Sequence, residues 1–121
     1  MPRFTVLLHE TPPDYPRPRH WDLLLARGAY LQTWALAQPP TNDTPIVADE
    51  LPPHRLMYLD YEGPISGERG KVTQVDTGEY TLDTDQPDVI KGELFGGALN
   101  GRFCLTRSDG NAQMWEFRFL P

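Results

Sequence analysis

Prolines and glycines divide this chain into short segments, and this division limits its fold more than any other feature. The 121 residues include 13 prolines and 10 glycines, spread from one end of the chain to the other. Both residue types mark turns, and proline also removes a backbone donor, so long helices are disfavoured. The segments between them alternate apolar and polar residues, which is the period of a half-buried strand. The sequence therefore predicts an all-β protein without a long amphipathic helix.

Regular turn signals separate the predicted strands. These strands are expected at residues 4–9, 20–25, 29–36, 46–48, 56–61, 72–75, 79–82, 90–95, 101–106 and 114–119. Residues 72–75 and 79–82 are expected to form a hairpin around Asp76-Thr77-Gly78. Residues 11–18 and 37–53 are predicted as proline-rich loops, the second containing the short strand at 46–48. Many short strands favour a compact antiparallel β-barrel or a sandwich, and a barrel suits a site inside it or at its mouth.

Length, charge and cysteine content restrict the class of protein further. A chain of 121 residues suits one domain, residues 1–121. A lone Cys104, interpreted as structural, and an N-terminus without a secretory signal predict a cytoplasmic protein, and no apolar run is long enough to span a membrane. The net charge of −6 disfavours tight non-specific binding of nucleic acid, because cations must neutralise the phosphates. Any contact with nucleic acid must therefore be local.

The histidines form the most informative pattern. On a strand, His20 and Asp22 would point to one face, while Trp21 between them turns into the core. His9 ends another apolar segment, and a neighbouring strand could bring its imidazole beside them. Two histidines and one carboxylate make a metal-binding face that leaves coordination positions open. The alternative interpretation is a hydrogen-bonded surface pair without a metal.

Longer motifs point to a family. Residues 3–9 read R-F-T-V-L-L-H, residues 20–25 read H-W-D-L-L-L and residues 33–36 read T-W-A-L. Further along, the chain has H-R-L-M-Y-L-D-Y-E-G at 54–63, G-E-L-F at 92–95, L-N-G-R-F at 99–103 and Trp115 in the last predicted strand. In this order the motifs resemble the 3′-phosphoesterase domain of bacterial DNA ligase D, and the chain looks like a divergent, stand-alone member.

That resemblance implies a fold and a function. It implies a compact β-barrel that binds manganese, or another divalent metal, and removes 3′-phosphates and 3′-ribonucleotides from DNA ends during non-homologous end joining. By the same resemblance His9, His20 and Asp22 are the metal ligands, His54 binds or protonates the scissile phosphate, and Tyr58 assists the phosphomonoester step. The expected partners are DNA 3′ ends or another phosphorylated substrate and a DNA ligase, and the expected state is a monomer without a membrane association.

Departures from the family pattern leave other functions open. Leu7 stands where the family has glutamine, Leu24 where it has arginine and Gln38 where it has a basic residue. Arginine forks hold phosphate oxygens in a way that leucine does not. Arg17 and Arg19, in the loop before His20, are candidate replacements that would bind phosphate. The alternatives are a non-catalytic metal-binding or protein-interaction barrel, and an esterase for another small anionic substrate.

Overall fold

The computed structural model describes residues 1–41 and 44–121, and the regular structure of this part is almost entirely β-strand, as predicted. No helix in these ranges is long and apolar enough to cross a membrane. The elements are β1 (Arg3–Glu10), β2 (His20–Arg27), β3 (Tyr30–Leu36), β4 (Ile46–His54), the 3-10 helix η1 (Leu56–Leu59), β5 (Gly63–Pro64), β6 (Lys71–Gln86), β7 (Val89–Gly96), β8 (Asn100–Arg107) and β9 (Met114–Leu120).

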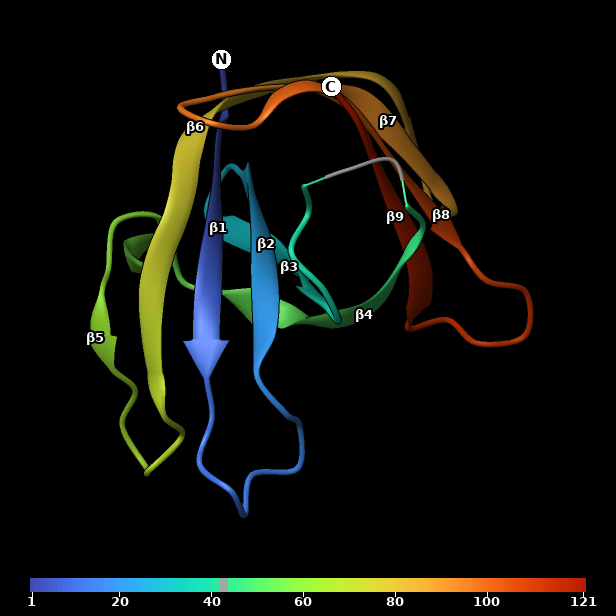
Figure 1. Ribbon diagram of the computed structural model, residues 1–121. Helices are drawn as coiled ribbons and strands as arrows, with labels where there is room; N and C mark the ends of the chain where they lie inside the picture. The colour runs from blue at the N-terminus through green and yellow to red at the C-terminus, as the bar shows by residue number, and fades with distance from the viewer. Residues whose placement is uncertain (42–43) are drawn as a thin grey trace.

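The strands close into an antiparallel barrel (Figure 1). Within the described residues, eight strands follow the order β1-β2-β3-β4-β9-β8-β7-β6, and β6 pairs back with β1. The short strand β5 adds to β6 outside this ring. The prediction of an all-β antiparallel barrel is therefore confirmed.

Alternate residues of the strands fill the barrel interior. Phe4 and Val6 of β1 and Leu23 and Leu25 of β2 are buried there with aromatic residues of the other strands. The rings of Trp34 and Trp115 also meet there edge to face, with their centroids 5.6 Å apart. Trp21 packs against the same core, as predicted from its place between His20 and Asp22. The interior is thus occupied by side chains.

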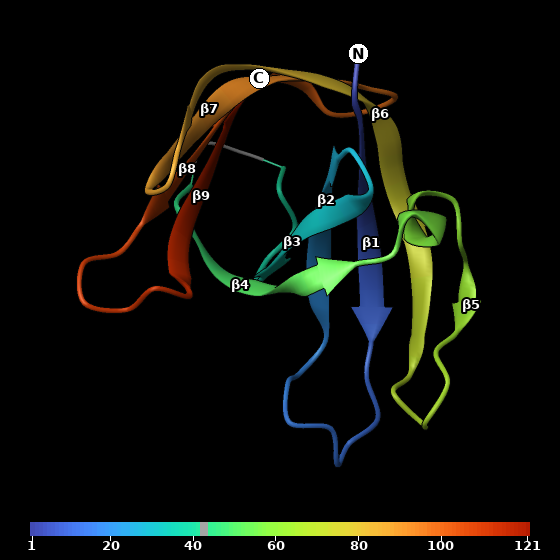
Figure 2. The same ribbon diagram turned by 180° about the vertical axis from the view of Figure 1, so that it is seen from behind.

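A second apolar cluster lies on the outer face of the barrel wall. Its buried members are Leu7, Leu24, Leu31, Leu59 and Val72, and we call it the outer cluster. The segment between β4 and β6, which contains η1 and β5, runs outside the wall beside β6 and β1 (Figure 2). The Thr5 hydroxyl donates to the Leu59 carbonyl at 2.9 Å, and Arg3 pairs with Asp60 at 2.8 Å. These contacts hold the segment against the outer face.

The predicted strand at 56–61 is wrong. Residues Leu56–Leu59 form η1, with Tyr58 N donating to Arg55 O at 3.1 Å. Leu59 enters the outer cluster, whereas Leu56 and Met57 are exposed. The apolar residues here cover the outer cluster instead of pairing with another strand, and periodicity over so short a segment does not separate the two outcomes.

The predicted hairpin at 72–82 is also wrong, because β6 continues through it without a turn. The carboxylate of Asp76 accepts hydrogen bonds from the backbone amides of Gly97, Ala98 and Leu99 at 2.8 to 3.1 Å. At Gly78, a Cβ would lie 2.1 Å from the carbonyl oxygen of Phe95. The aspartate caps the loop between β7 and β8 and the glycine permits close strand contact, so neither makes a turn.

The proline-rich segment 37–53, whose residues 42–43 lie outside the described part, contains more strand than expected. β4 extends from Ile46 to His54 and includes Pro52-Pro53. It pairs with β9 only over Ile46 to Asp49, so the two prolines lie beyond that pairing and interrupt none of its hydrogen bonds.

Candidate metal centre

The hairpin of β1 and β2 brings the predicted metal ligands together. His9 lies opposite His20 in the register, and Leu7 lies opposite Asp22. All three side chains are buried, and their ligand atoms lie within 4.8 Å of one another. His20 and Asp22 share the face of Leu24, which is the outer face of the wall. The centre therefore lies outside the barrel and not inside it or at its mouth, because core side chains fill the interior.

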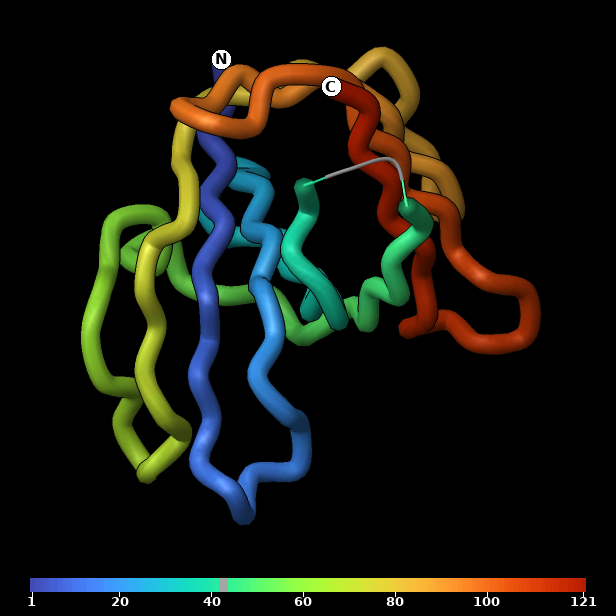
Figure 3. Tube along the Cα trace, viewed as in Figure 1, coloured from blue at the N-terminus to red at the C-terminus, as the bar shows by residue number. Residues whose placement is uncertain are grey.

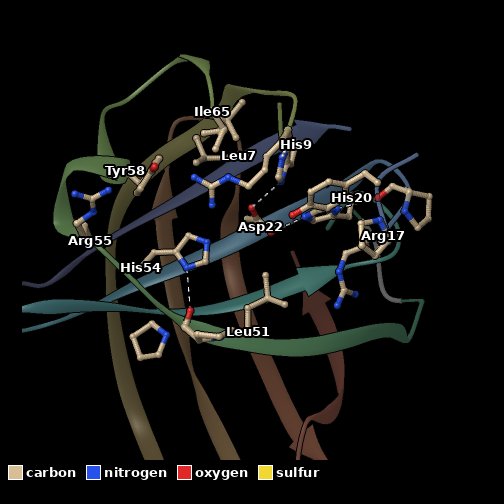
Figure 4. A pocket seen from close by; sticks show the side chains of 17 residues that line it. Leu7, His9, Arg17, His20, Asp22, Leu51, His54, Arg55, Tyr58 and Ile65 are labelled. Atoms are coloured by element: carbon tan, nitrogen blue, oxygen red, sulfur yellow. Dashed lines mark hydrogen bonds and ion pairs between the residues drawn. The ribbon is translucent and has the colours of Figure 1, made fainter. Parts of the chain in front are cut away.

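The imidazole nitrogens of both histidines approach the carboxylate of Asp22 (Figure 4). His20 Nε2 lies 3.1 Å from Asp22 Oδ1, and His9 Nδ1 lies 3.8 Å from Asp22 Oδ2. The two imidazoles meet edge to face, with centroids 4.7 Å apart. Three donor atoms thus face a common point.

Each imidazole donates a hydrogen bond to a backbone carbonyl through the ring nitrogen that does not approach Asp22. His9 Nε2 donates to the carbonyl of Arg69 at 2.7 Å, and His20 Nδ1 donates to the carbonyl of Pro18 at 2.9 Å. A carbonyl oxygen only accepts, so these nitrogens carry hydrogens, and in the neutral imidazole the opposite nitrogen presents its lone pair to Asp22. This arrangement of a metal ligand and its backing acceptor is common in metal sites.

One atom of the centre is left without a hydrogen bond. Asp22 Oδ1 is fully buried and has no hydrogen-bond donor among the described residues, although His20 Nε2 is near. A buried carboxylate oxygen without a partner is costly, and a divalent cation would compensate it. The donor set of two histidines and one carboxylate therefore fits a divalent metal.

The loops that follow β1 and β5 extend in the same direction beyond the barrel (Figure 3), and each contacts one histidine of the centre through a backbone carbonyl. A pocket of about 700 Å³ opens there, and its lining includes the three candidate ligands. His54, Tyr58 and Arg17 also line it, so the structure brings these sequence-predicted residues to one place. Arg19 is not in the lining, because its guanidinium stacks on Trp21 at 5.6 Å.

His54 and Tyr58 lie across the pocket from the metal centre (Figure 4). Their rings meet edge to face with centroids 5.9 Å apart, and Tyr58 makes a similar contact with Tyr61 at 5.7 Å. His54 Nδ1 donates to the carbonyl of Pro52 at 2.9 Å. This bond leaves Nε2 as the nitrogen that can serve a ligand in the pocket.

Two further arginines, which were not predicted from the sequence, also line the pocket. Arg55 follows His54 directly, and Arg69 lies in the turn between β5 and β6. Adjacency to His54 could have drawn attention to Arg55. No local signal indicated Arg69, because its position depends on how the segment after η1 returns to β1.

Comparison with protein families tests the resemblance. Residues 13–107, well over half of the chain, match the model of the DNA Ligase D 3′-phosphoesterase domain. The chain belongs to this DNA-repair family. The matched range includes His20, Asp22, His54 and Tyr58, while His9 lies just before it.

Known members of the DNA ligase D family share extended identity with the chain. The multifunctional non-homologous end joining protein LigD of Mycobacterium bovis is 35% identical over 101 residues, which cover 76% of this chain and 13% of the relative. The LigD repair protein of Mycobacterium tuberculosis strain CDC 1551 gives the same values. This family member therefore spans about one eighth of the length of those relatives.

Three positions show how this member of the 3′-phosphoesterase family departs from the expected pattern. Leu7 and Leu24, which stand where polar residues were expected, are fully buried in the outer cluster. Gln38, the third departure, is exposed. Of the two leucines, only Leu7 lines the pocket, and neither supplies a cation, so any cation for a phosphate must come from other lining residues.

Proposed function

We propose that this chain is a metal-dependent phosphoesterase that removes a 3′-phosphate or a 3′-ribonucleotide from DNA ends during repair. The observation that carries the proposal is the buried Asp22 carboxylate, which has one oxygen without a hydrogen bond and lies beside two oriented imidazoles in the same pocket as His54. Membership of the 3′-phosphoesterase family supplies the reaction class. Such a role fits a monomeric, cytoplasmic domain that works beside a DNA ligase.

His9, His20 and Asp22 would hold Mn²⁺ or another divalent metal. When bound, the metal supplies Lewis-acid neutralisation of phosphate oxygens and a site for water. The carbonyls of Arg69 and Pro18 keep the two imidazoles in the tautomers that leave their lone pairs toward Asp22.

His54 and Tyr58 would act on the phosphate. Hydrolysis breaks the bond between phosphorus and the 3′ oxygen, water supplies the new oxygen on phosphorus, and the leaving oxygen gains a proton. With Nδ1 held by Pro52, the Nε2 of protonated His54 can bind a phosphate oxygen or give that proton. The Tyr58 hydroxyl, beside the His54 ring, can donate a hydrogen bond to a second phosphate oxygen.

A non-catalytic metal-binding or protein-interaction barrel is the second candidate. The observation that favours it is the burial of Leu7 and Leu24 in the outer cluster, where the family pattern has residues that bind phosphate. A chain that lost those contacts could keep the metal centre as a structural element.

The deciding experiment is manganese-dependent phosphate release from a DNA primer-template that ends in a 3′-phosphate. We expect release by the unchanged chain and none by His20→Ala, with Arg102→Ala as a matched control, because Arg102 pairs with Asp83 at an exposed position outside the pocket. Circular dichroism would check that both variants fold. Manganese binding without release in the unchanged chain would refute the enzyme and favour the second candidate.

A further inference from the structure

Cationic groups gather around the pocket of an acidic protein. The chain has a net charge of −6, yet all three of its histidines line this one pocket. Arg17, Arg55 and Arg69 line it too, and among the described lining residues Asp22 is the single acid. The pocket is thus rich in basic side chains although the chain as a whole is acidic, and it favours an anionic ligand.

The three arginines differ in the partners of their guanidinium groups, and only one of them is paired with a carboxylate. Arg17 Nη2 lies 2.5 Å from Asp49 Oδ2, so a carboxylate compensates it. Arg55 and Arg69 are both exposed, but the Arg55 side chain, at the edge of the pocket beside Tyr58 (Figure 4), makes no hydrogen bond or ion pair with a described residue. Arg69 donates from Nε to the Ser66 carbonyl at 2.7 Å and from Nη2 to the Ser66 hydroxyl at 3.3 Å. Its guanidinium is therefore held in place by neutral acceptors that leave its charge uncompensated.

The turn that carries Arg69 is fixed against the metal centre. Gly70 has a φ of 91°, and a Cβ at this position would lie 1.9 Å from the carbonyl oxygen of Glu10. Glu68 also adopts a positive φ, of 57°. This tight turn packs on the end of β1, where the Arg69 carbonyl accepts the hydrogen of His9 Nε2 at 2.7 Å. One residue thus orients a metal ligand through its backbone and presents a cation to the same pocket through its side chain.

We infer that Arg69 is the principal phosphate-binding arginine of this pocket, because Leu7 and Leu24 supply no polar group for a phosphate. The free N–H groups of its guanidinium would hold non-bridging oxygens of a terminal phosphate at the metal centre. This assignment differs from the sequence-based candidates, since Arg19 stacks on Trp21 and Arg17 is paired with Asp49. It rests on the proposed function for the identity of the substrate.

Steady-state kinetics on the 3′-phosphorylated primer-template test the role of Arg69. Arg69→Ala is expected to raise KM by about tenfold or more, the effect of losing one charge-assisted interaction, with a smaller change in kcat. Arg69→Lys should recover part of the loss, because it restores the charge without the fork. Arg102→Ala removes the same charge elsewhere and should leave both constants unchanged. Manganese affinity should stay the same in all variants, since the Arg69 carbonyl remains.

Calorimetric titration of the manganese-loaded protein with inorganic phosphate separates this inference from the proposed function. Phosphate binding that weakens in Arg69→Ala, in a protein that releases no phosphate from DNA, would uphold Arg69 and reject the enzyme. Equal KM and equal phosphate affinity in the unchanged chain and Arg69→Ala would reject Arg69 and leave the enzyme standing. Failure of the unchanged chain to bind phosphate would also reject Arg69. If Arg69→Ala does not fold, Arg69→Gln supplies the same comparison.

Discussion

Asp22 and Leu24 lie two residues apart on the outer face of β2, one in the metal centre and the other fully buried in the outer cluster. A residue of the pocket lining and a residue of the outer cluster are therefore successive positions on one strand face. Leu7 repeats the relationship on β1, where it lies opposite Asp22. Both leucines pack in the outer cluster, on the same strand faces as the candidate metal ligands.

Leu24→Ala should lower the free energy of unfolding by about 2 to 4 kcal/mol, because it removes a fully buried side chain from the outer cluster. Urea denaturation of the metal-free protein would measure the change. Val75→Ala is the matched control, since Val75 is 47% exposed and its truncation should cost less than about 0.5 kcal/mol. A loss at Leu24 no larger than at Val75 would show that the outer cluster contributes little to stability.

Asp22→Asn should separate stability from metal binding. Without metal, the variant should be at least as stable as the unchanged chain, because it removes a buried charge with an unpaired oxygen. Saturating manganese should raise the Tm of the unchanged chain and not that of the variant; at a hundredfold excess over Kd the stabilisation is about 2.7 kcal/mol. Thermal melting with and without manganese would measure both effects. A marked loss of metal-free stability would indicate that the carboxylate has a structural role of its own.

Acid should weaken the link between Arg27 and Asp85, which joins the end of β2 to β6. Two hydrogen bonds from Arg27, at 2.8 and 3.0 Å, lower the pKa of Asp85 below its usual value. Because the folded pKa lies below the unfolded one, the contribution is present above about pH 4 and is lost as the pH falls through the folded pKa. Solvent screening limits it to under about 1 kcal/mol, since the Asp85 side chain is 52% exposed.

Urea denaturation of the unchanged chain and Asp85→Asn would measure this pH dependence. The difference in unfolding free energy should be larger at about pH 7 than at about pH 2. The same difference at both values would mean that the carboxylate charge contributes nothing.

The sequence could predict that His9, His20 and Asp22 lie together, because their geometry is local. His20 and Asp22 share a strand face, and the hairpin of β1 and β2 places His9 opposite His20. The strand periodicity likewise predicted the alternation that fills the barrel. The predictions were wrong at η1 and in the middle of β6, where residues distant in the sequence decide the structure. Leu59 of η1 packs in the outer cluster, and the amides of residues 97–99 donate to Asp76 of β6.

Arg69 shows what local pattern cannot supply. Its place beside His9 depends on the pairing of β1 with β6 and on the turn at Gly70, which packs against Glu10. Nothing in the residues around it distinguishes its side chain from those of other solvated arginines.

Because the pocket lies outside a filled barrel, separate sets of residues stabilise the fold and form much of the pocket wall. Interior residues such as Phe4 and Trp34 secure the scaffold, while the segment from residue 55 to residue 70 forms much of the opposite wall of the pocket. Substitutions in that segment can alter which ligands enter without disturbing interior packing. Changes confined to this one external segment can therefore alter the ligand of the domain while the barrel stays the same.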